Sequence, residues 1–245
     1  MSNDCLFDKQ INSVIEKGKN TMSWILRTFK TRSITPMLTL YKSLLLAIIE
    51  YCSALWCPLG VGQIKKLEAI QWSFIRKINN TKGLNYWECL KSTKLYSLQR
   101  RRERYRIIYI WKILEKIVPN INNSITSYNH IRHGRKCNIP VSNASAKLSK
   151  LREASLPIHG ARLFNALPND VRNLSNVSVA KFKRALDNFL RLVPDEPQIP
   201  GLTSCRRANS NSIIEMIELK RNSTVHSITQ MTRGADGEMY DRLAN

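Results

Sequence analysis

Residues Asn85–Asn120 read NYWECLKSTKLYSLQRRRERYRIIYIWKILEKIVPN, and this stretch decides the fold that we expect. Its pattern predicts a short helix, a break, and a long helix from about Leu98 to Val118. The back of the long helix is apolar. We therefore expect the apolar residues to pack into the core and to hold a block of positive charge at the surface, in which Glu103 is the one acidic residue. The charge block comprises Arg100, Arg101, Arg102, Arg104 and Arg106. The apolar face comprises Ile107, Ile108, Ile110, Trp111, Ile113, Leu114 and Ile117.

This arginine cluster is a candidate contact for phosphate. Arginine is always charged at neutral pH, and its planar fork matches the oxygens of a phosphate group. Five arginines within two helical turns repel one another, so something acidic has to offset the repulsion. We favour a nucleic-acid backbone as that partner, and the alternative is an ordinary solvated charged face.

The composition points to the same class of partner. The chain has 245 residues with 43% hydrophobic content, so a folded core in one large or two small domains is expected. Lys and Arg total 39 against 18 Asp and Glu, which gives a net charge of +21 spread along the chain. Such an excess favours a polyanion. A basic membrane-surface protein is the rival, but no amphipathic surface helix or lipidation motif supports it.

The cysteines and histidines give no clear metal site. The six cysteines lack CxxC spacing, and His130 and His133 near Cys137 lack a fourth ligand. The polar N-terminus has no secretory pattern, and the apolar run Met37–Ile49 is too short to span a bilayer. We expect a nuclear or cytoplasmic protein that is not secreted, has no membrane contact, and has no small-molecule substrate.

The hydrophobic periodicity predicts a mainly α protein. We expect a basic helical bundle over 1–120, an irregular or weakly stranded basic connector over 121–157, and a helical C-terminal unit over 158–193. A proline-containing extended segment and a mobile polar tail would follow over 194–245. Thr35 and Pro36 predict the start of a central helix that ends before Pro58. The other predicted helices span 8–29, 63–79, 158–167, 178–192 and 213–220.

No catalytic signature occurs in the sequence. Nucleotidyl transfer needs two carboxylates that hold a pair of magnesium ions about 4 Å apart, and no Asp-Asp pair follows an aromatic residue. The chain also lacks a phosphate-binding glycine loop, GxSxG and HExxH. From the residues alone we expect a basic, mostly helical, nucleic-acid-binding protein with no catalytic residue and no cofactor of its own.

Several stretches nevertheless carry a family resemblance. They are WILRTFKTR, TPMLTLYKSL, EYCSALWCP, LEAIQ, LNYWECLK, LYSLQRRRERYRIIYIWKI, REASLPIHGARLFNALPNDVRNL, FKRALDNFL and VPDEPQIPG. Together they cover roughly residues 6–217. They resemble the region that follows the polymerase palm in LINE-type, non-LTR retrotransposon endonuclease–reverse transcriptases of jockey-like and related animal elements.

The resemblance implies a thumb-like region that grips primer–template, RNA or an RNA–DNA hybrid. The magnesium-binding aromatic-any-Asp-Asp motif of the family lies upstream of the part matched, so no catalytic residue carries over. A separate or missing polymerase palm is the implied protein partner. Trp72 and Cys89 stand where the family has arginine, and the frame that opens at Met1 without a palm suggests a truncated element copy. The residues that the resemblance assigns to nucleic-acid contact are Arg27, Lys30, Arg32, Arg76, Lys77, Arg100, Arg101, Arg102, Arg104 and Arg106.

Two alternatives remain at this point. In one, the host retains the basic bundle as a domesticated nucleic-acid-binding module, or the chain is a non-functional remnant. In the other, the chain is a protein-interaction module, because loss of the palm would leave apolar side chains exposed. The side chains expected in that patch are Leu44, Leu45, Ile48, Ile49 and Trp56.

Overall fold

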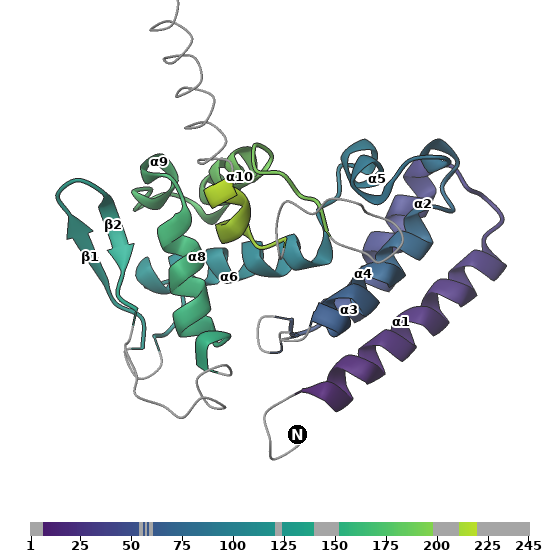
Figure 1. The fold of residues 1–245 in the computed structure, drawn as a ribbon, viewed down its shortest axis with the longest axis horizontal. Coiled ribbons are helices and arrows are strands. Elements are labelled where there is room, and N and C mark those ends of the chain that lie inside the picture. Colours follow the sequence, from purple (N-terminus) through teal and green to yellow (C-terminus); the bar gives the residue numbers. More distant parts are fainter. Residues whose placement is uncertain are drawn as a thin grey trace, which may run out of the picture.

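The computed structural model describes residues 7–53, 56, 58, 61–120, 124–139, 152–197 and 211–219. As predicted, the protein is mainly α, and the described part contains one small two-stranded sheet. Figure 1 shows two groups of helices at opposite ends of the molecule, with α6 (Leu98–Leu114) running from one to the other. None of the helices within the described ranges is both long and apolar enough to cross a bilayer.

The N-terminal group is built around a first core to which α1, α4 and the segment from α2 to α3 all contribute. Gly18 lies in the middle of α1. The helix is continuous there, and an added Cβ would lie 3.3 Å from Ile70 and 3.4 Å from Ile49. The glycine thus permits close helix packing. The elements are α1 (Asp8–Thr28), α2 (Ile34–Leu40), η1 (Tyr41–Leu45), α3 (Leu46–Ile49), α4 (Val61–Ile75), η2 (Asn79–Thr81) and α5 (Tyr86–Thr93).

The predicted central helix is shorter and less regular than expected. It begins after Ser33 rather than at Thr35, passes through the π-helical turn η1, and ends at Ile49. Cys52 then adopts φ +53°, which a helix cannot continue through. The apolar composition of this segment hid its early end, because a run that is apolar on most sides has no periodicity to lose.

The apolar patch expected for protein interaction is largely internal. Leu45, Ile49 and Trp56 are all buried, with exposed fractions of 0%, 0% and 2%. They join the first core, and Leu44 packs against it as a partly buried residue. The expectation of an exposed patch was therefore wrong for Leu45, Ile49 and Trp56, because they pack in one core with apolar side chains of α1 and α4.

The C-terminal group is built around a second core. The antiparallel hairpin of β1 and β2 confirms the expectation of a weakly stranded connector. Ser178 caps α10 as predicted, accepting from the Lys181 backbone N–H at 3.2 Å. A short helix that the periodicity did not predict begins at Asn169. The elements are β1 (Ser127–His130), β2 (Gly134–Cys137), η4 (Leu156–Gly160), α8 (Ala161–Ala166), α9 (Asn169–Arg172) and α10 (Val179–Leu190).

Residues 211–219 are part of the second core, with helical backbone over 213–219. Ile213 is fully buried, and its backbone N–H donates to Glu103 at 2.7 Å. The prediction of a short helix here is confirmed. The prediction of mobility is wrong for this segment, because its apolar side chains bind α6. The remainder of the predicted tail, at 198–210 and 220–245, lies outside the described residues.

The two cores meet along α6. Leu98 belongs to the first core, and Ile107, Ile110 and Trp111 belong to the second. The core division therefore falls within α6 and not at residue 120. The helix ends at Leu114, before the predicted Val118, because Lys116 adopts φ +58°.

Replacing Trp111 with alanine should destabilise the protein by about 4 kcal/mol. The indole is fully buried, stacks on Phe182 with ring centroids 4.4 Å apart, and donates to Leu174 O at 2.7 Å. Urea unfolding followed by circular dichroism measures the change. Tyr109→Ala, on the exposed side of the same helix, should shift stability by only about 0.5 kcal/mol. Equal effects of the two changes would contradict the assigned helix facing.

Candidate nucleic-acid interface

The arginine cluster of α6 lies inside the molecule rather than on its surface. Arg100, Arg102 and Arg106 have exposed fractions of 0%, 4% and 2%. Arg100 donates to Val193 O at 3.3 Å and Pro194 O at 2.6 Å. The predicted outward facing of this cluster was wrong, because the chain folds back over both sides of α6.

Arg102 and Arg106 make different internal contacts. The guanidinium of Arg102 lies 5.1 Å from the centroid of the Trp56 ring, which is a favourable cation–π geometry. Arg106 donates from one nitrogen to Ala154 O at 3.0 Å and lies 3.0 Å from His159 Nδ1. Burial, together with the charge of Arg106, lowers the pKa of His159 to about 4. The imidazole is therefore neutral at pH 7 and can accept from the guanidinium.

Two further arginines of the cluster form ion pairs across the molecule. Arg101 binds Glu50 through two bonds, of 2.7 and 2.9 Å, and Arg104 binds Asp187 through bonds of 2.6 and 2.7 Å. Both are the planar two-point contact that a guanidinium makes with a carboxylate. Glu50, at the end of α3, is thus paired with an arginine of α6. The acidic partner that the cluster requires is thus supplied by the same chain.

The start of α6 is also held by a polar network. Ser97 donates its backbone N–H and its hydroxyl to Asp195, at 2.8 and 2.7 Å, and accepts from Asn211 at 3.0 Å. A carboxylate at a helix N-terminus is favourable because the helix dipole is positive there. Sequence reasoning missed this site, since Asp195 lies almost a hundred residues from the helix that it stabilises.

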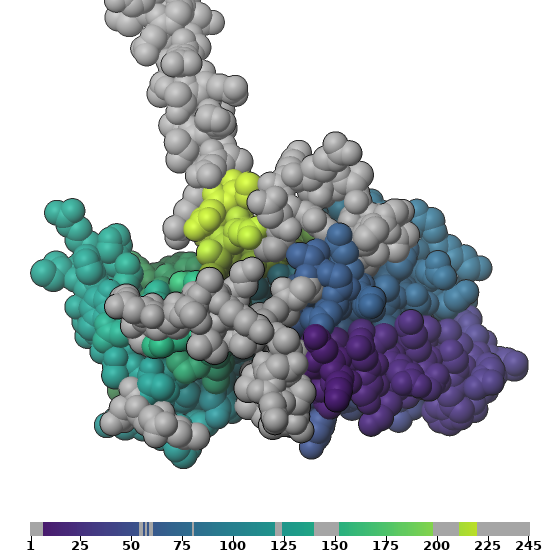
Figure 2. Space-filling view, turned by 60° about the horizontal axis from the view of Figure 1, so that its bottom comes forward, coloured from purple at the N-terminus to yellow at the C-terminus, as the bar shows by residue number. Residues whose placement is uncertain are grey.

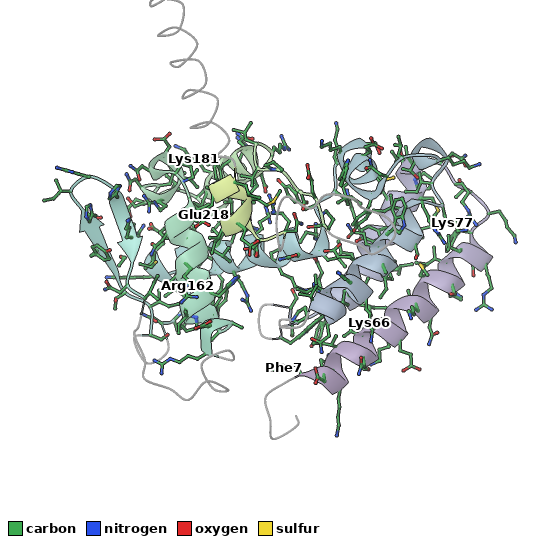
Figure 3. The ribbon with its side chains drawn as sticks, in the orientation of Figure 1. Phe7, Lys66, Lys77, Arg162, Lys181 and Glu218 are labelled. Carbon is green, nitrogen blue, oxygen red and sulfur yellow. The ribbon has the colours of Figure 1, made fainter. Side chains whose placement is uncertain are left out.

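The remaining predicted contacts gather at one end of the N-terminal group. We call Arg27, Lys30, Arg32, Arg76 and Lys77 the terminal patch. The last turns of α1 and α4 meet there, and the Asn79 backbone N–H donates to Arg32 O at 3.0 Å. Lys77 lies beside the connection from α1 to α2 (Figure 3).

Within the terminal patch, Arg32 binds backbone carbonyls, and the other four side chains are exposed. The Arg32 guanidinium donates to Leu26 O, Phe29 O and Thr31 O, at 2.9, 2.5 and 2.7 Å. It therefore satisfies carbonyls at the end of α1. The exposed four supply a cationic surface that can meet phosphate without any change of fold.

The positions where the family has arginine are internal in this chain. Trp72 is 8% exposed and packs edge-on against Tyr86, with ring centroids 5.4 Å apart. Cys89 is fully buried. Neither exchange removes a cation from the surface, so neither weakens the terminal patch.

The described residues offer no group of three or more His, Cys, Asp or Glu side chains that could hold a metal ion. His130 and His133 pack with ring centroids 4.7 Å apart on the exposed hairpin. The Cys137 thiol is buried on the inner side of that hairpin, and burial raises its pKa to about 12.

Comparison with known proteins adds no identification. The chain matches no protein-family model, no curated protein and no solved structure.

Arg100→Ala should lower the free energy of unfolding by about 3 kcal/mol, because it leaves buried carbonyls and the nearby Glu103 without their cation. Arg76→Ala, at an exposed position, should change it by only about 0.5 kcal/mol. Chemical denaturation of the two variants measures the difference. An Arg100→Ala protein of unaltered stability would mean that the cluster faces solvent after all.

Stability should also depend on the buried carboxyl of Glu68. It accepts from Tyr86 Oη at 2.7 Å and from the Gln99 backbone N–H at 2.8 Å, and burial raises its pKa to about 7. Because the pKa of this carboxyl is higher in the folded chain than in the unfolded chain, its protonated form stabilises the fold at pH values below the unfolded-state pKa. That stabilisation is lost as the pH rises through about 7.

The free energy of unfolding of Glu68→Gln, taken relative to that of the parent, should therefore rise by up to about 3 kcal/mol between about pH 5 and pH 8. The difference between the two unfolding curves at each pH isolates this carboxyl from His159, whose lowered pKa acts in the opposite direction at lower pH. Glu16→Gln, on an exposed face of α1, is the control and should track the parent at both pH values. A pH-independent offset for Glu68→Gln would refute the assignment.

Proposed function

We propose that this chain is the post-palm, thumb-like region of a non-LTR retrotransposon reverse transcriptase. Its biochemical activity is binding of RNA or an RNA–DNA hybrid through the terminal patch. The proposal assigns no catalytic residue and no magnesium site to the chain, since no position matches the aromatic-any-Asp-Asp motif. A host that kept such a chain would use the same binding surface.

The observation that carries the proposal is that arginines form the internal ion pairs, whereas lysines remain available to a partner. Three ion pairs among the described residues each join an arginine to a carboxylate: Arg101–Glu50, Arg104–Asp187 and Arg135–Glu115. No lysine within the described ranges takes part in one.

Further carboxylates are also committed internally. Glu68, Glu103 and Asp195 bind backbone or side-chain donors inside the fold. These carboxylates are held within the fold, whereas Asp8, Glu16 and Glu88 are exposed, and with a net charge of +21 the cations still predominate. A surface of one sign raises the local concentration of a polyanion and speeds its association.

The terminal patch suits this role because of where its cations stand. Arg27, Lys30, Arg76 and Lys77 follow or close the helices α1 and α4, and no acidic residue lies between Glu16 and Glu50. Cations at helix C-termini are individually favourable there. Their convergence from two helices on one end gives several phosphate contacts at a single place.

The protein-interaction alternative has less support. Leu45, Ile49 and Trp56 of its expected apolar patch lie in the first core. The exposed large apolar side chains lie on several elements, and Tyr128 and Ile131 are the two on the β1–β2 hairpin.

The triple variant Lys30→Ala, Arg76→Ala, Lys77→Ala should bind a single-stranded RNA of about 20 nucleotides at least tenfold more weakly than the parent. The slope of log affinity against log salt should become shallower by about 2, because each phosphate contact on a single strand contributes about 0.7. Fluorescence anisotropy at several salt concentrations measures both quantities.

The matched control is Lys181→Ala, Lys183→Ala, Arg184→Ala on α10, which removes the same kinds of charge from the other half of the molecule (Figure 3). It should reduce affinity by only about twofold. Equal losses in both variants would show that binding follows total charge and would sink the assignment of the patch. Absence of RNA binding by the parent would sink the proposed function.

A further inference from the structure

The β1–β2 hairpin projects from the end of the molecule opposite to the terminal patch. Figure 1 shows it beside α8, and Figure 2 shows its teal surface standing out from the body. No Asp or Glu occurs between Glu115 and Glu153, so the whole hairpin and its flanks lack acidic side chains. That gap is the sequence signal that could have drawn attention to this element.

One face of the hairpin is fastened to the fold. Arg135 forms an ion pair with Glu115 at 2.6 Å, and its backbone N–H donates to Asn173 at 2.9 Å. The backbone of Cys137 exchanges hydrogen bonds with the Asn165 amide, at 2.8 and 2.9 Å. The inner face is therefore fixed against the C-terminal helices.

The turn is fastened as well. Gly134 adopts φ +64°, and a Cβ there would collide with the side chain of Asn173. Arg172 donates to His133 O at 2.6 Å, which ties the turn to α9. The hairpin is thus a preorganised projection, and a partner would not have to order it on binding.

The outer face carries cations and one aromatic ring. Strand pairing places Tyr128 opposite Lys136 and His130 opposite Gly134, and alternation puts these side chains on the face away from Arg135 and Cys137. Tyr128 is 44% exposed. The charge of Lys136 lowers the pKa of the exposed His133, which places two basic groups close together.

The tip adds an apolar side chain to this basic surface. Ile131 is fully exposed, and it is followed directly by Arg132, whose side chain is also exposed. A partner that covers Ile131 would remove a large apolar side chain from water, which would favour binding at this tip.

We infer that the outer face of this hairpin is a second nucleic-acid-binding surface and that its ligand is a B-form DNA duplex. A two-stranded ribbon fits the major groove of B-DNA, which is about 12 Å wide, whereas the major groove of A-form RNA is too deep and narrow to enter. Arg132 and Lys136 contact phosphates, and Ile131 meets the apolar edge of the groove, such as a thymine methyl group. The inference does not depend on the terminal patch, which lies at the other end of the molecule (Figure 1).

The test uses the full chain with a fluorescent DNA duplex and an RNA duplex of the same sequence, each of about 20 base pairs, or about two helical turns. Arg132→Ala, Lys136→Ala should raise the Kd for the DNA duplex about tenfold and make its salt slope shallower by about 2. Binding of the RNA duplex should change by less than about twofold. Ile131→Ser, at a fully exposed position, should weaken DNA binding about fivefold.

Two matched variants serve as controls. Lys183→Ala, Arg184→Ala on α10 removes one lysine and one arginine, and Ile117→Ser changes another exposed isoleucine. Both should bind the DNA duplex as the parent does, within about twofold. Circular dichroism of every variant should match the parent, since none of the changed side chains is buried.

Several outcomes would overturn the inference. One is a parent chain that does not bind the DNA duplex, and another is equal weakening on DNA and RNA duplexes. A third is hairpin variants that bind DNA as the parent does. A change in oligomeric state caused by Ile131→Ser, with DNA affinity unchanged, would instead make the hairpin a protein contact. Loss of RNA binding in the terminal-patch variant with DNA binding retained would support two separate surfaces.

Discussion

The structure depends on the cost of removing a guanidinium group from water. A buried arginine has five N–H donors and a permanent charge, and burial is costly unless acceptors within the fold compensate for most of the lost hydration. Two donors on α6 have no such acceptor among the described residues, the Nε groups of Arg100 and Arg106. Along α6 these acceptors are the carboxylates of Glu50 and Asp187 and the carbonyls of Val193, Pro194 and Ala154. Each acceptor comes from a segment distant in sequence. The arginines of one helix therefore determine where α3, the η4 region and the chain after α10 can lie.

This requirement also explains why α6 contributes to both cores. Its first turn packs Leu98 into the N-terminal core, and its second half packs Ile107 and Trp111 into the C-terminal core. The arginines lie between these two groups of apolar residues on α6, so the boundary between the two cores is polar. The two halves of the molecule thus share one helix, and ion pairs and hydrogen bonds of its arginines hold them together at their boundary.

Sequence patterns predicted the helical class and most of the helices because amphipathic periodicity reports a local property. The helix over 178–192 and the break between α5 and α6 both followed from the hydrophobic pattern. The facing of the arginine cluster could not be predicted in this way. Periodicity shows that Arg100 and Ile107 differ in polarity, but it does not show that Pro194 or Glu50 will cover the polar side. Exposure at Lys30 and Lys77 followed more simply, since no acidic neighbour was available to draw them inward.

The contrast between the internal arginines of α6 and the lysines of the surface has a consequence for how this sequence changes over generations. Drift at Lys30, Lys77 or Lys181 alters the electrostatic field and leaves the packing intact, whereas drift at Arg100 or Arg104 removes a tie between distant segments. A lineage released from selection for binding would lose its surface lysines while its buried arginines persisted for as long as the chain needed to fold. The ratio of surviving lysines to surviving α6 arginines among copies of this sequence would then record which of the two constraints each copy still obeys.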